Sequence, residues 1–269
     1  MSETVIQVTS LGKRIKGKTI LEDISFEINQ GDCVALIGPN GAGKTVLMSC
    51  ILGDKKPSSG QVLIDGKAGK AKNKIAVLLQ ENTIPNSLKV SELIAFFQSI
   101  SDNPLTNQKV QELLQFKEDQ YQQFADKLSG GQRRLLAFVL CLIDKPKILF
   151  LDEPTAGMDT STRQRFWEIV NDLKKSGVTI LYSSHYIEEV EHTADRILVL
   201  HQGKLIRDTT PYAMRHEEKE KQVTLPSSFV NIVHGLEDIY EVTEKRDVIS
   251  FMTKDIEKVW QSLEKSGCG

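Results

Sequence analysis

Hydrophobic residues follow two different periods along the first 210 residues. Short apolar runs, typical of buried strands, alternate with stretches in which apolar residues recur every three or four positions, typical of helices. The predicted strands are two or more within residues 1–30, around a Gly/Lys-rich turn at 12–18, and then 34–37, 61–65, 75–79, 148–151, 178–182, 197–200 and 204–207. The predicted helices are 44–52, 133–143, 161–175 and 187–192. This alternation predicts an α/β layered fold with a largely parallel sheet.

The pattern changes between residues 87 and 124. Apolar residues there recur at helical spacing, and β-branched runs are few. Asn103 and Pro104 break the stretch into at least two helices, because proline cannot continue a helix interior. We expect a helical insert that continues through the helix at 133–143, so that a helical subdomain covers about residues 87–140.

The pattern of charged and apolar residues changes again after Thr210. Residues 216–221 are a mixed charge run, which predicts a solvated helix or a linker. Strands are predicted at 239–242 and 248–252, and a helix at 256–263. We therefore divide the chain into a main domain, 1–210, and a small α+β appendage, 211–269. The appendage could stabilise a dimer, bind a regulator or cover a sheet edge, and we assign it no role.

Composition narrows the class of protein. The apolar share of 40% and charged share of 26% are those of a globular protein. A net charge of −2 shows no excess of basic residues of the kind that nucleic-acid binding requires. The four cysteines are scattered, which predicts small buried side chains in a reducing compartment. They are Cys33, Cys50, Cys141 and Cys268.

Targeting and membrane signals are weak in this sequence. The N-terminus has no basic segment followed by an apolar one, so we expect no signal peptide. The longest apolar run, Leu135 to Ile143, is far shorter than the roughly 20 residues that span a bilayer. We expect a cytoplasmic chain that does not cross a membrane by itself.

A phosphate-binding loop is predicted at residues 38–45, which fit the pattern G-x-x-x-x-G-K-[ST]. In such loops backbone N–H groups surround phosphate oxygens, and the helix N-terminus that follows attracts an anion. Lys44 would contact the β- and γ-phosphates, and the Thr45 hydroxyl would ligate Mg²⁺. An unrelated glycine-rich turn is the alternative, but an apolar strand precedes the loop and a helical pattern follows it. The predicted nucleotide-binding residues here are Gly38, Pro39, Asn40, Gly41, Ala42, Gly43, Lys44, Thr45 and Val46.

Two acidic residues, Asp152 and Glu153, end the apolar strand at 148–151. Ligands collect at the carboxyl ends of strands in open α/β sheets. In phosphoryl-transfer sites one acid holds the magnesium shell and another group orients the attacking water. Asp152 fits the first role and Glu153 the second. A strand that simply ends in solvent-facing acids is the alternative.

The stretch LSGGQRR, residues 128–134, precedes a predicted helix without offering a nucleophile, a base or a metal ligand. Ser129 and Gln132 have the spacing of a capping box. That explanation leaves Gly130 and Gly131 unexplained, since glycine weakens a helix. Two glycines leave the helix N-terminus open to an anion, so we expect a second anion-binding position here, either for a second anion or for a shared nucleotide.

These motifs, together with Gln80, Asp159 and His185, occur in the order and approximate spacing of an ABC-transporter ATP-binding subunit. The resemblance covers roughly residues 5–208. The stretch from Leu151 to Asp159 resembles bacterial exporter subunits that serve multidrug, peptide-antibiotic or polysaccharide export. The resemblance implies a P-loop ABC ATPase fold with a parallel core sheet, an N-terminal antiparallel β region and a helical insert. It also implies Mg²⁺-dependent hydrolysis of ATP.

The resemblance assigns roles to individual residues. It implies that Gln80 contacts Mg²⁺ and the attacking water, that Asp152 supports Mg²⁺ and that Glu153 acts as general base. It implies that His185 contacts the γ-phosphate and that Asp159 organises a dimer seam. Considered without the other motifs, Gln80 would be a surface amide, and His185 a helix cap or a core histidine.

The resemblance also implies a head-to-tail dimer. The signature residues of one copy would close over the γ-phosphate held by Lys44 of a second copy, or of a related ATPase subunit. These signature residues are Ser129, Gly130, Gly131 and Gln132.

One departure from the family concerns the base. Many members have an aromatic residue, near the first turn, that stacks on adenine, and Ile15 occupies that position here. An aliphatic side chain can cover the base but lacks the stacking contribution. We therefore expect weaker or less base-selective binding, unless a one-residue offset brings another group under the base.

A separate membrane-spanning permease is the expected partner, because no membrane-spanning segment is predicted in this sequence. The subunit would then lie peripherally on the cytoplasmic side of the membrane. The helical insert is where the family docks its permease, and the apolar residues Ile94, Phe96, Phe97 and Ile100 are candidates for that interface or for the core.

Two alternatives stay open. A soluble ABC-type ATPase could act on ribosomes or nucleic acid, although this chain has one cassette, no long coiled coil and no basic face. A regulatory protein could bind nucleotide without turnover, although Glu153 and His185 argue against that.

Overall fold

The computed structural model describes residues 3–68, 75–81, 84–85, 87–217 and 221–265. It contains two compact units, Met1–Pro211 and Tyr212–Gly269, which we describe separately. Cys268 and residues 218–220 of the charge run lie outside the described residues. Among the described residues, none of the helices combines the length and the apolar character needed to cross a bilayer.

A six-stranded sheet forms the centre of the larger unit, with the order β10-β9-β3-β8-β7-β6. Five strands are parallel to their neighbours, and β10 is antiparallel to β9. Their bounds are β3 Cys33–Ile37, β6 Ile75–Leu78, β7 Ile148–Leu151, β8 Thr179–Ser184, β9 Arg196–His201 and β10 Lys204–Thr209. Every residue of β3, β7 and β8 is buried, which explains their continuous apolar runs. The predicted α/β fold with a parallel sheet is confirmed.

A second, antiparallel sheet has the order β2-β1-β4-β5. Its strands are β1 Thr4–Ile15, β2 Lys18–Asn29, β4 Ser59–Ile64 and β5 Lys67–Ala68. The predicted turn within 12–18 is confirmed but is shorter than expected, because β1 continues through Gly12 to Ile15 and the chain turns at Lys16 and Gly17. Gly12 serves close packing: a Cβ there would lie 2.4 Å from the Ser59 Oγ. Glycine in a strand marks such an approach as well as a turn.

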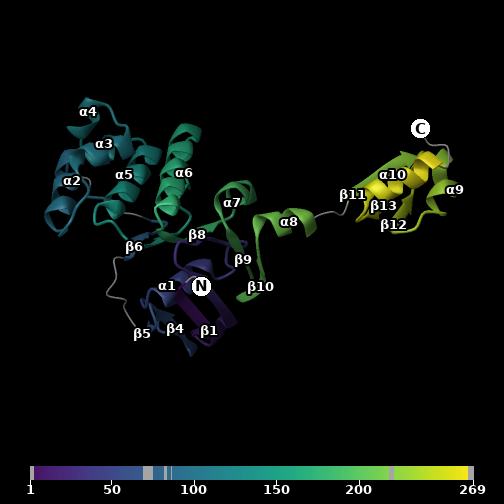
Figure 1. Cartoon of the computed structure of the whole chain (residues 1–269), viewed down its shortest axis with the longest axis horizontal. Coiled ribbons are helices and arrows are strands. Elements are labelled where there is room, and N and C mark those ends of the chain that lie inside the picture. Colours follow the sequence, from purple (N-terminus) through teal and green to yellow (C-terminus); the bar gives the residue numbers. More distant parts are fainter. Residues whose placement is uncertain (1–2, 69–74, 82–83, 86, 218–220, 266–269) are drawn as a thin grey trace. The chain divides into compact units, whose positions relative to one another are not determined.

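The helical region lies between β6 and β7 (Figure 1). It contains α2 Val90–Ser99, α3 Asn107–Leu114, α4 Glu118–Tyr121, η1 Ala125–Lys127 and α5 Gly130–Leu142. Helix α5 packs against α2, α3, β6 and the long α6 (Thr160–Lys175). Phe138 of α5 and Phe166 of α6 form the centre of one contact, with ring centroids 4.4 Å apart. The predicted helical insert is confirmed, and α5 begins three residues before the predicted start.

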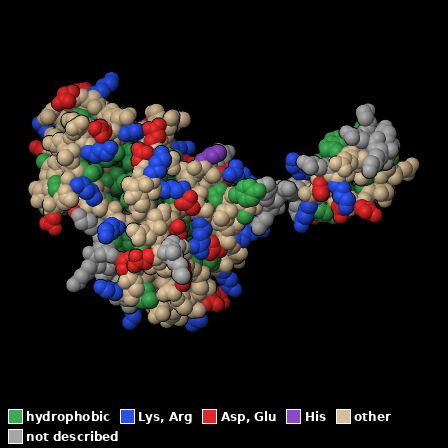
Figure 2. Space-filling view, in the orientation of Figure 1, with side chains coloured by type: hydrophobic (Ala, Val, Ile, Leu, Met, Phe, Trp, Pro, Cys, Tyr) green, Lys and Arg blue, Asp and Glu red, His purple; other side chains and the backbone are tan. Residues whose placement is uncertain are grey.

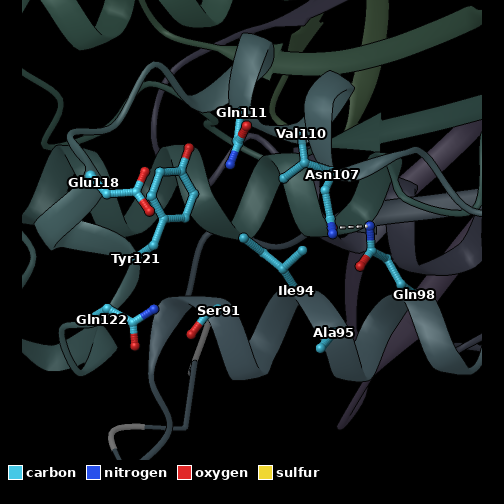
Figure 3. Close-up of a pocket in the computed structure, with 10 residues that line it drawn as sticks. All are labelled: Ser91, Ile94, Ala95, Gln98, Asn107, Val110, Gln111, Glu118, Tyr121 and Gln122. Atoms are coloured by element: carbon cyan, nitrogen blue, oxygen red, sulfur yellow. Dashed lines mark hydrogen bonds between the residues drawn. The ribbon is translucent and has the colours of Figure 1, made fainter.

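A cavity of about 230 Å³ opens between α2, α3 and α4. Figure 3 shows the Ile94 side chain at its centre, Tyr121 at one end and the hydrogen-bonded pair Gln98 and Asn107 at the other. Its lining includes none of the predicted nucleotide-site residues. The remaining helices of the larger unit are α1 Lys44–Ile51 and α7 Ile187–Thr193, and α8 Pro211–Glu217 spans the boundary of the two units.

The described cysteines behave as small hydrophobic side chains. Cys33 and Cys50 are buried, Cys141 is partly buried, and none of the three forms a disulfide. Burial raises the pKa of Cys33 to about 12 and that of Cys141 to about 11. Both thiols therefore stay protonated and unreactive at neutral pH.

The smaller unit contains a three-stranded antiparallel sheet with the order β11-β13-β12. Its elements are β11 Lys221–Pro226, η2 Ser227–Phe229, α9 Val230–Val233, β12 Ile239–Glu244, β13 Val248–Thr253 and α10 Ile256–Lys265. The predicted strands 239–242 and 248–252 and the helix 256–263 are confirmed. Strand β11 was missed because the charge run ends at its first residue, although Val223 and Leu225 alternate inward to the core.

Candidate functional site

The loop at residues 38–45 connects β3 to the N-terminus of α1, as predicted. Gly43 lies at the helix N-cap with φ 107°, and a Cβ there would lie 2.7 Å from Leu21. No side chain caps α1, so its first N–H groups remain available to an anion. Lys44 is buried and folds back over the loop, where its Nζ donates to the Gly38 carbonyl at 2.7 Å.

Thr45 and Asp152 join the loop to the end of β7. The Thr45 hydroxyl donates to Asp152 Oδ2 at 2.8 Å. The Ser183 hydroxyl, from β8, donates to the other carboxylate oxygen at 2.5 Å. Asp152 is only 4% exposed, so these two bonds fix its orientation. A hydroxyl and a carboxylate oxygen side by side are ligands that suit Mg²⁺, so these residues fit the predicted ion.

Glu153 is the point at which the predicted catalytic residues meet. Gln80 Nε2 donates to Glu153 Oε2 at 3.1 Å. Lys44 Nζ lies 3.9 Å and His185 Nδ1 3.7 Å from Glu153 Oε1. The structure therefore brings residues from three other segments of the chain to one carboxylate.

The backbone of Glu153 is strained. Its φ of 44° is in the left-handed region, which costs a non-glycine residue on the order of 1–3 kcal/mol. Its N–H donates to the Ser183 Oγ at 2.8 Å, which helps to hold this conformation. Such strain is found chiefly at active sites and ligand clamps. Ser183 was not among the predicted site residues.

A cavity of about 370 Å³ lies over these groups. It is lined by Ile20, Asn40, Gly41, Gly43, Lys44, Thr45, Val46, Gln80 and Glu153. Ile15, the predicted contact to the base, is partly exposed at the end of β1 and does not belong to this lining. Ile20 takes part instead, and no sequence pattern pointed to it beyond its place in a predicted strand.

Comparison with known proteins decides the family. The model of the family described as "ABC transporter" matches residues 21–156. The multidrug ABC transporter ATP-binding protein YbhF (termed "probable") of Escherichia coli K12 is 31% identical over 244 residues, covering 86% of this chain and 42% of its own length. The Nod factor export ATP-binding protein I of Ralstonia nicotianae is 34% identical over 224 residues. That match covers 79% of this chain and 69% of the relative. The chain belongs to the ABC transporter family.

A solved structure gives the same result for the fold of this ABC protein. It is the dimeric post-hydrolysis state of an ATP-binding cassette bound to ADP and Pi, with 20% identity and a TM-score of 0.68. The match covers 77% of this chain and 98% of that one. The present chain spans less than half the length of YbhF.

The ABC signature stretch begins helix α5. The Ser129 Oγ accepts from the Gln132 N–H at 3.2 Å, and the Ser129 N–H donates to Gln132 Oε1 at 3.1 Å. The predicted capping box is confirmed. Gly130 is exposed and faces open space, whereas a Cβ on Gly131 would lie 3.1 Å from Asp159 Oδ2. None of these residues lines the cavity above Lys44.

Asp159 caps helix α6. Its carboxylate accepts from the Thr162 N–H at 3.0 Å, the Ser161 hydroxyl at 2.7 Å and the Thr162 hydroxyl at 2.8 Å. These hydrogen bonds hold the pKa of Asp159 well below its usual range. The residue that the resemblance placed at a dimer seam therefore also has a local role within one copy.

His185, the predicted contact to the γ-phosphate, is supported by residues that sequence reasoning missed. The His185 ring stacks on Tyr186 with centroids 4.0 Å apart, and the Arg163 guanidinium lies 5.4 Å from the Tyr186 ring centroid. Arg163 Nε is 3.4 Å from Glu189, which also accepts from the Thr155 hydroxyl at 3.0 Å. This network connects the loop after Glu153 to the segment that carries His185. No local pattern pairs residues so far apart in sequence.

Proposed function

We propose that this chain binds and hydrolyses ATP and thereby powers a separate membrane permease in an export system. The convergence of Lys44, Gln80 and His185 on Glu153, beside the Thr45–Asp152 pair, is the observation that carries the proposal. A regulator that only binds nucleotide would not need a strained, hydrogen-bonded carboxylate at this position.

The reaction follows from this geometry. The loop N–H groups and Lys44 hold the β- and γ-phosphates, and Thr45 and Asp152 would hold Mg²⁺. Bound there, the ion would neutralise charge that develops on the phosphate oxygens. Glu153 orients a water and accepts its proton as the water oxygen attacks the γ-phosphorus. The bond to the β-phosphate oxygen breaks, and ADP and phosphate are the products.

Gln80 and His185 position the reactants. The Gln80 amide holds one oxygen of Glu153 and would also contact Mg²⁺, and His185 would contact the γ-phosphate. Ile20 contacts the base or ribose as part of the cavity lining, to which Ile15 does not belong. Without an aromatic ring, this end of the site contributes less to nucleotide affinity and base selectivity than stacking would.

A head-to-tail dimer would complete the site. The exposed helix start at Gly130 offers a backbone N–H to an anion, yet it does not line this copy's own cavity. The related cassette bound to ADP and Pi is dimeric. In the proposed dimer the signature of one copy closes over the γ-phosphate on Lys44 of the other, and Asp159 lies at the seam.

The permease would dock on the helical region. A groove of about 300 Å³ runs between β6, α2 and the end of α5, and Phe97 and Ile100 line it. Phe96 and Ile100 are 55% and 66% exposed, which is unusual for large apolar side chains and is typical of contact surfaces. Ile94 is buried, so the core interpretation holds for that residue.

The named relatives favour export, because one is a multidrug transporter protein and the other exports Nod factor. Cargo is set by the permease. The chain would lie peripherally on the cytoplasmic face of the membrane. Figure 2 shows acidic and basic side chains interspersed over the visible face of the larger unit, so no observation favours a nucleic-acid substrate.

Copurification tests the transporter role. The tagged chain, extracted from its native membranes in mild detergent, should bring with it a hydrophobic protein with several membrane spans. Salt and ribonuclease washes should leave that pair intact. A chain that stays wholly soluble and monomeric with ATP, or that copurifies with ribosomes, would contradict the proposal.

A further inference from the structure

Arg134 is a buried cation whose side-chain hydrogen bonds, within the described part of the chain, all go to backbone carbonyls. It is 8% exposed and lies one turn inside α5, in the same helix that begins with the signature. Its guanidinium donates to five backbone carbonyls. Nη1 donates to Leu79 and to Gln80 (2.9 Å), Nη2 to Asp152 (3.0 Å) and Glu153 (3.3 Å), and Nε to Pro154 (3.1 Å).

These carbonyls belong to the two segments that carry the proposed catalytic groups. Residues 79–80 follow the end of β6, and residues 152–154 follow the end of β7. Beyond the strand ends the sheet ladder no longer supplies partners for backbone carbonyls, which need them when buried. Arg134 supplies those partners to both segments at once.

A guanidinium is suited to this contact by its shape. It holds five N–H donors in one rigid plane, whereas a lysine ammonium presents three donors from a single point. Burial lowers the pKa of Arg134, while Asp152, Cys141 and Glu153 act in the opposite direction. An arginine stays charged in any case, and hydrogen bonds to a charged donor are stronger than neutral ones.

The contact bears on the strained backbone of Glu153. Ser183 holds the N–H of this residue from β8, and Arg134 holds its carbonyl from α5. The left-handed conformation at φ 44° is therefore supported on both sides. A peptide in a costly conformation relaxes when one support is removed, and the Glu153 carboxylate would move with it.

We propose that Arg134 is a positioning residue for hydrolysis. Its hydrogen bonds fix the Gln80 and Glu153 backbones relative to the signature helix α5. This inference rests on the proposed ATPase function. It implies that a shift of α5, driven by a permease or by the partner signature, changes the geometry of water activation in the same copy. Arg134 itself touches neither nucleotide nor water in this account.

Arg134→Lys tests the proposal, because lysine keeps the positive charge but lacks the planar set of five N–H donors. We expect kcat to fall about 10- to 100-fold, since misplacement of a catalytic group by about 1 Å costs on that order. The Kd for ATP, measured with a fluorescent analogue, should stay within about twofold, because the phosphate loop is not touched. In a Glu153→Gln background the same change should cause little further loss, since both act through one carboxylate.

Arg165→Lys is the matched control. Arg165 also donates to two backbone carbonyls, those of Glu112 and Leu113, but these lie in α3, away from the site. Its substitution should lower thermal stability, although less than Arg134→Lys does because fewer carbonyls lose a donor, and should leave kcat near the wild-type value.

Hydrogen exchange on the full chain separates this inference from the proposed function. In Arg134→Lys, peptides that cover residues 79–81 and 152–156 should exchange faster, while the rest of the larger unit keeps its protection. Unchanged exchange and unchanged kcat would overturn the inference. If the wild-type chain shows no hydrolysis, the proposed function fails, and exchange still decides whether Arg134 holds these segments.

Discussion

Thr45 Oγ1 donates a hydrogen bond to Asp152 Oδ2 over 2.8 Å, although the two residues are 107 positions apart in the sequence. The bond joins the first turn of α1 to the end of β7. It places two of the three predicted magnesium ligands together at the carboxyl edge of the sheet, where open α/β folds bind their ligands. The phosphate loop and the acidic strand end therefore form one site.

Thr45→Val should raise the Mg²⁺ concentration that gives half-maximal ATP hydrolysis, because it keeps the side-chain shape and removes the hydroxyl. Thr45→Ser retains the hydroxyl and should behave like the wild type. The measurement is a magnesium titration at saturating ATP. Identical titrations for Thr45→Val and the wild type would contradict the role of Thr45 as a ligand.

Asp159→Asn should make the chain less stable at neutral pH, because the amide cannot accept all the hydrogen bonds that the carboxylate accepts. The pKa of Asp159 is depressed in the folded state. Its stabilisation is therefore fully present above the unfolded pKa of about 3.9 and is lost as pH falls toward the folded value.

Urea unfolding of both proteins between pH 7 and pH 3 measures this effect. The gap between their midpoints should be constant near neutral pH and should shrink below about pH 4. A gap that grows as the pH falls would show that the carboxylate does not cap α6 as described.

Ser129→Arg should abolish hydrolysis and leave nucleotide binding by the monomer largely intact, because a large cation at the signature blocks closure over a second copy. Thr106→Arg is the control, since Thr106 caps α3 in the same way, by accepting from the Lys109 N–H at 3.2 Å. Thr106→Arg should lose helix stability and keep hydrolysis. Light scattering with ATP should show a dimer for Thr106→Arg and a monomer for Ser129→Arg. Full hydrolysis by Ser129→Arg would contradict the composite site.

Local patterns predicted the elements and the motif residues well, since both depend on short stretches of chain. The strand at 148–151 and its two acids are an example: apolar periodicity gave the strand, and its end gave the carboxylates. The capping box at Ser129 and Gln132 is another, because its partners are three residues apart.

Contacts between distant segments were not predictable in this way. Arg134 reaches residues 18 to 55 positions away, and nothing in LSGGQRR distinguishes it from Arg133. Gly12 was interpreted as part of a turn because its partner, Ser59, is not a sequence neighbour. Ile20 and Ser183 enter the site only through the pairing of strands. Sequence patterns therefore predicted least well the residues that support the site from distant parts of the chain.

Hydrolysis of ATP by the purified full chain and by Glu153→Gln, with Mg²⁺ present, tests the central claim most directly. The substitution keeps the size of the side chain and removes the base. We predict measurable phosphate release by the wild type, a loss of at least about 100-fold in Glu153→Gln, and ATP binding of equal strength in both. Equal rates of hydrolysis in the two proteins would contradict the account.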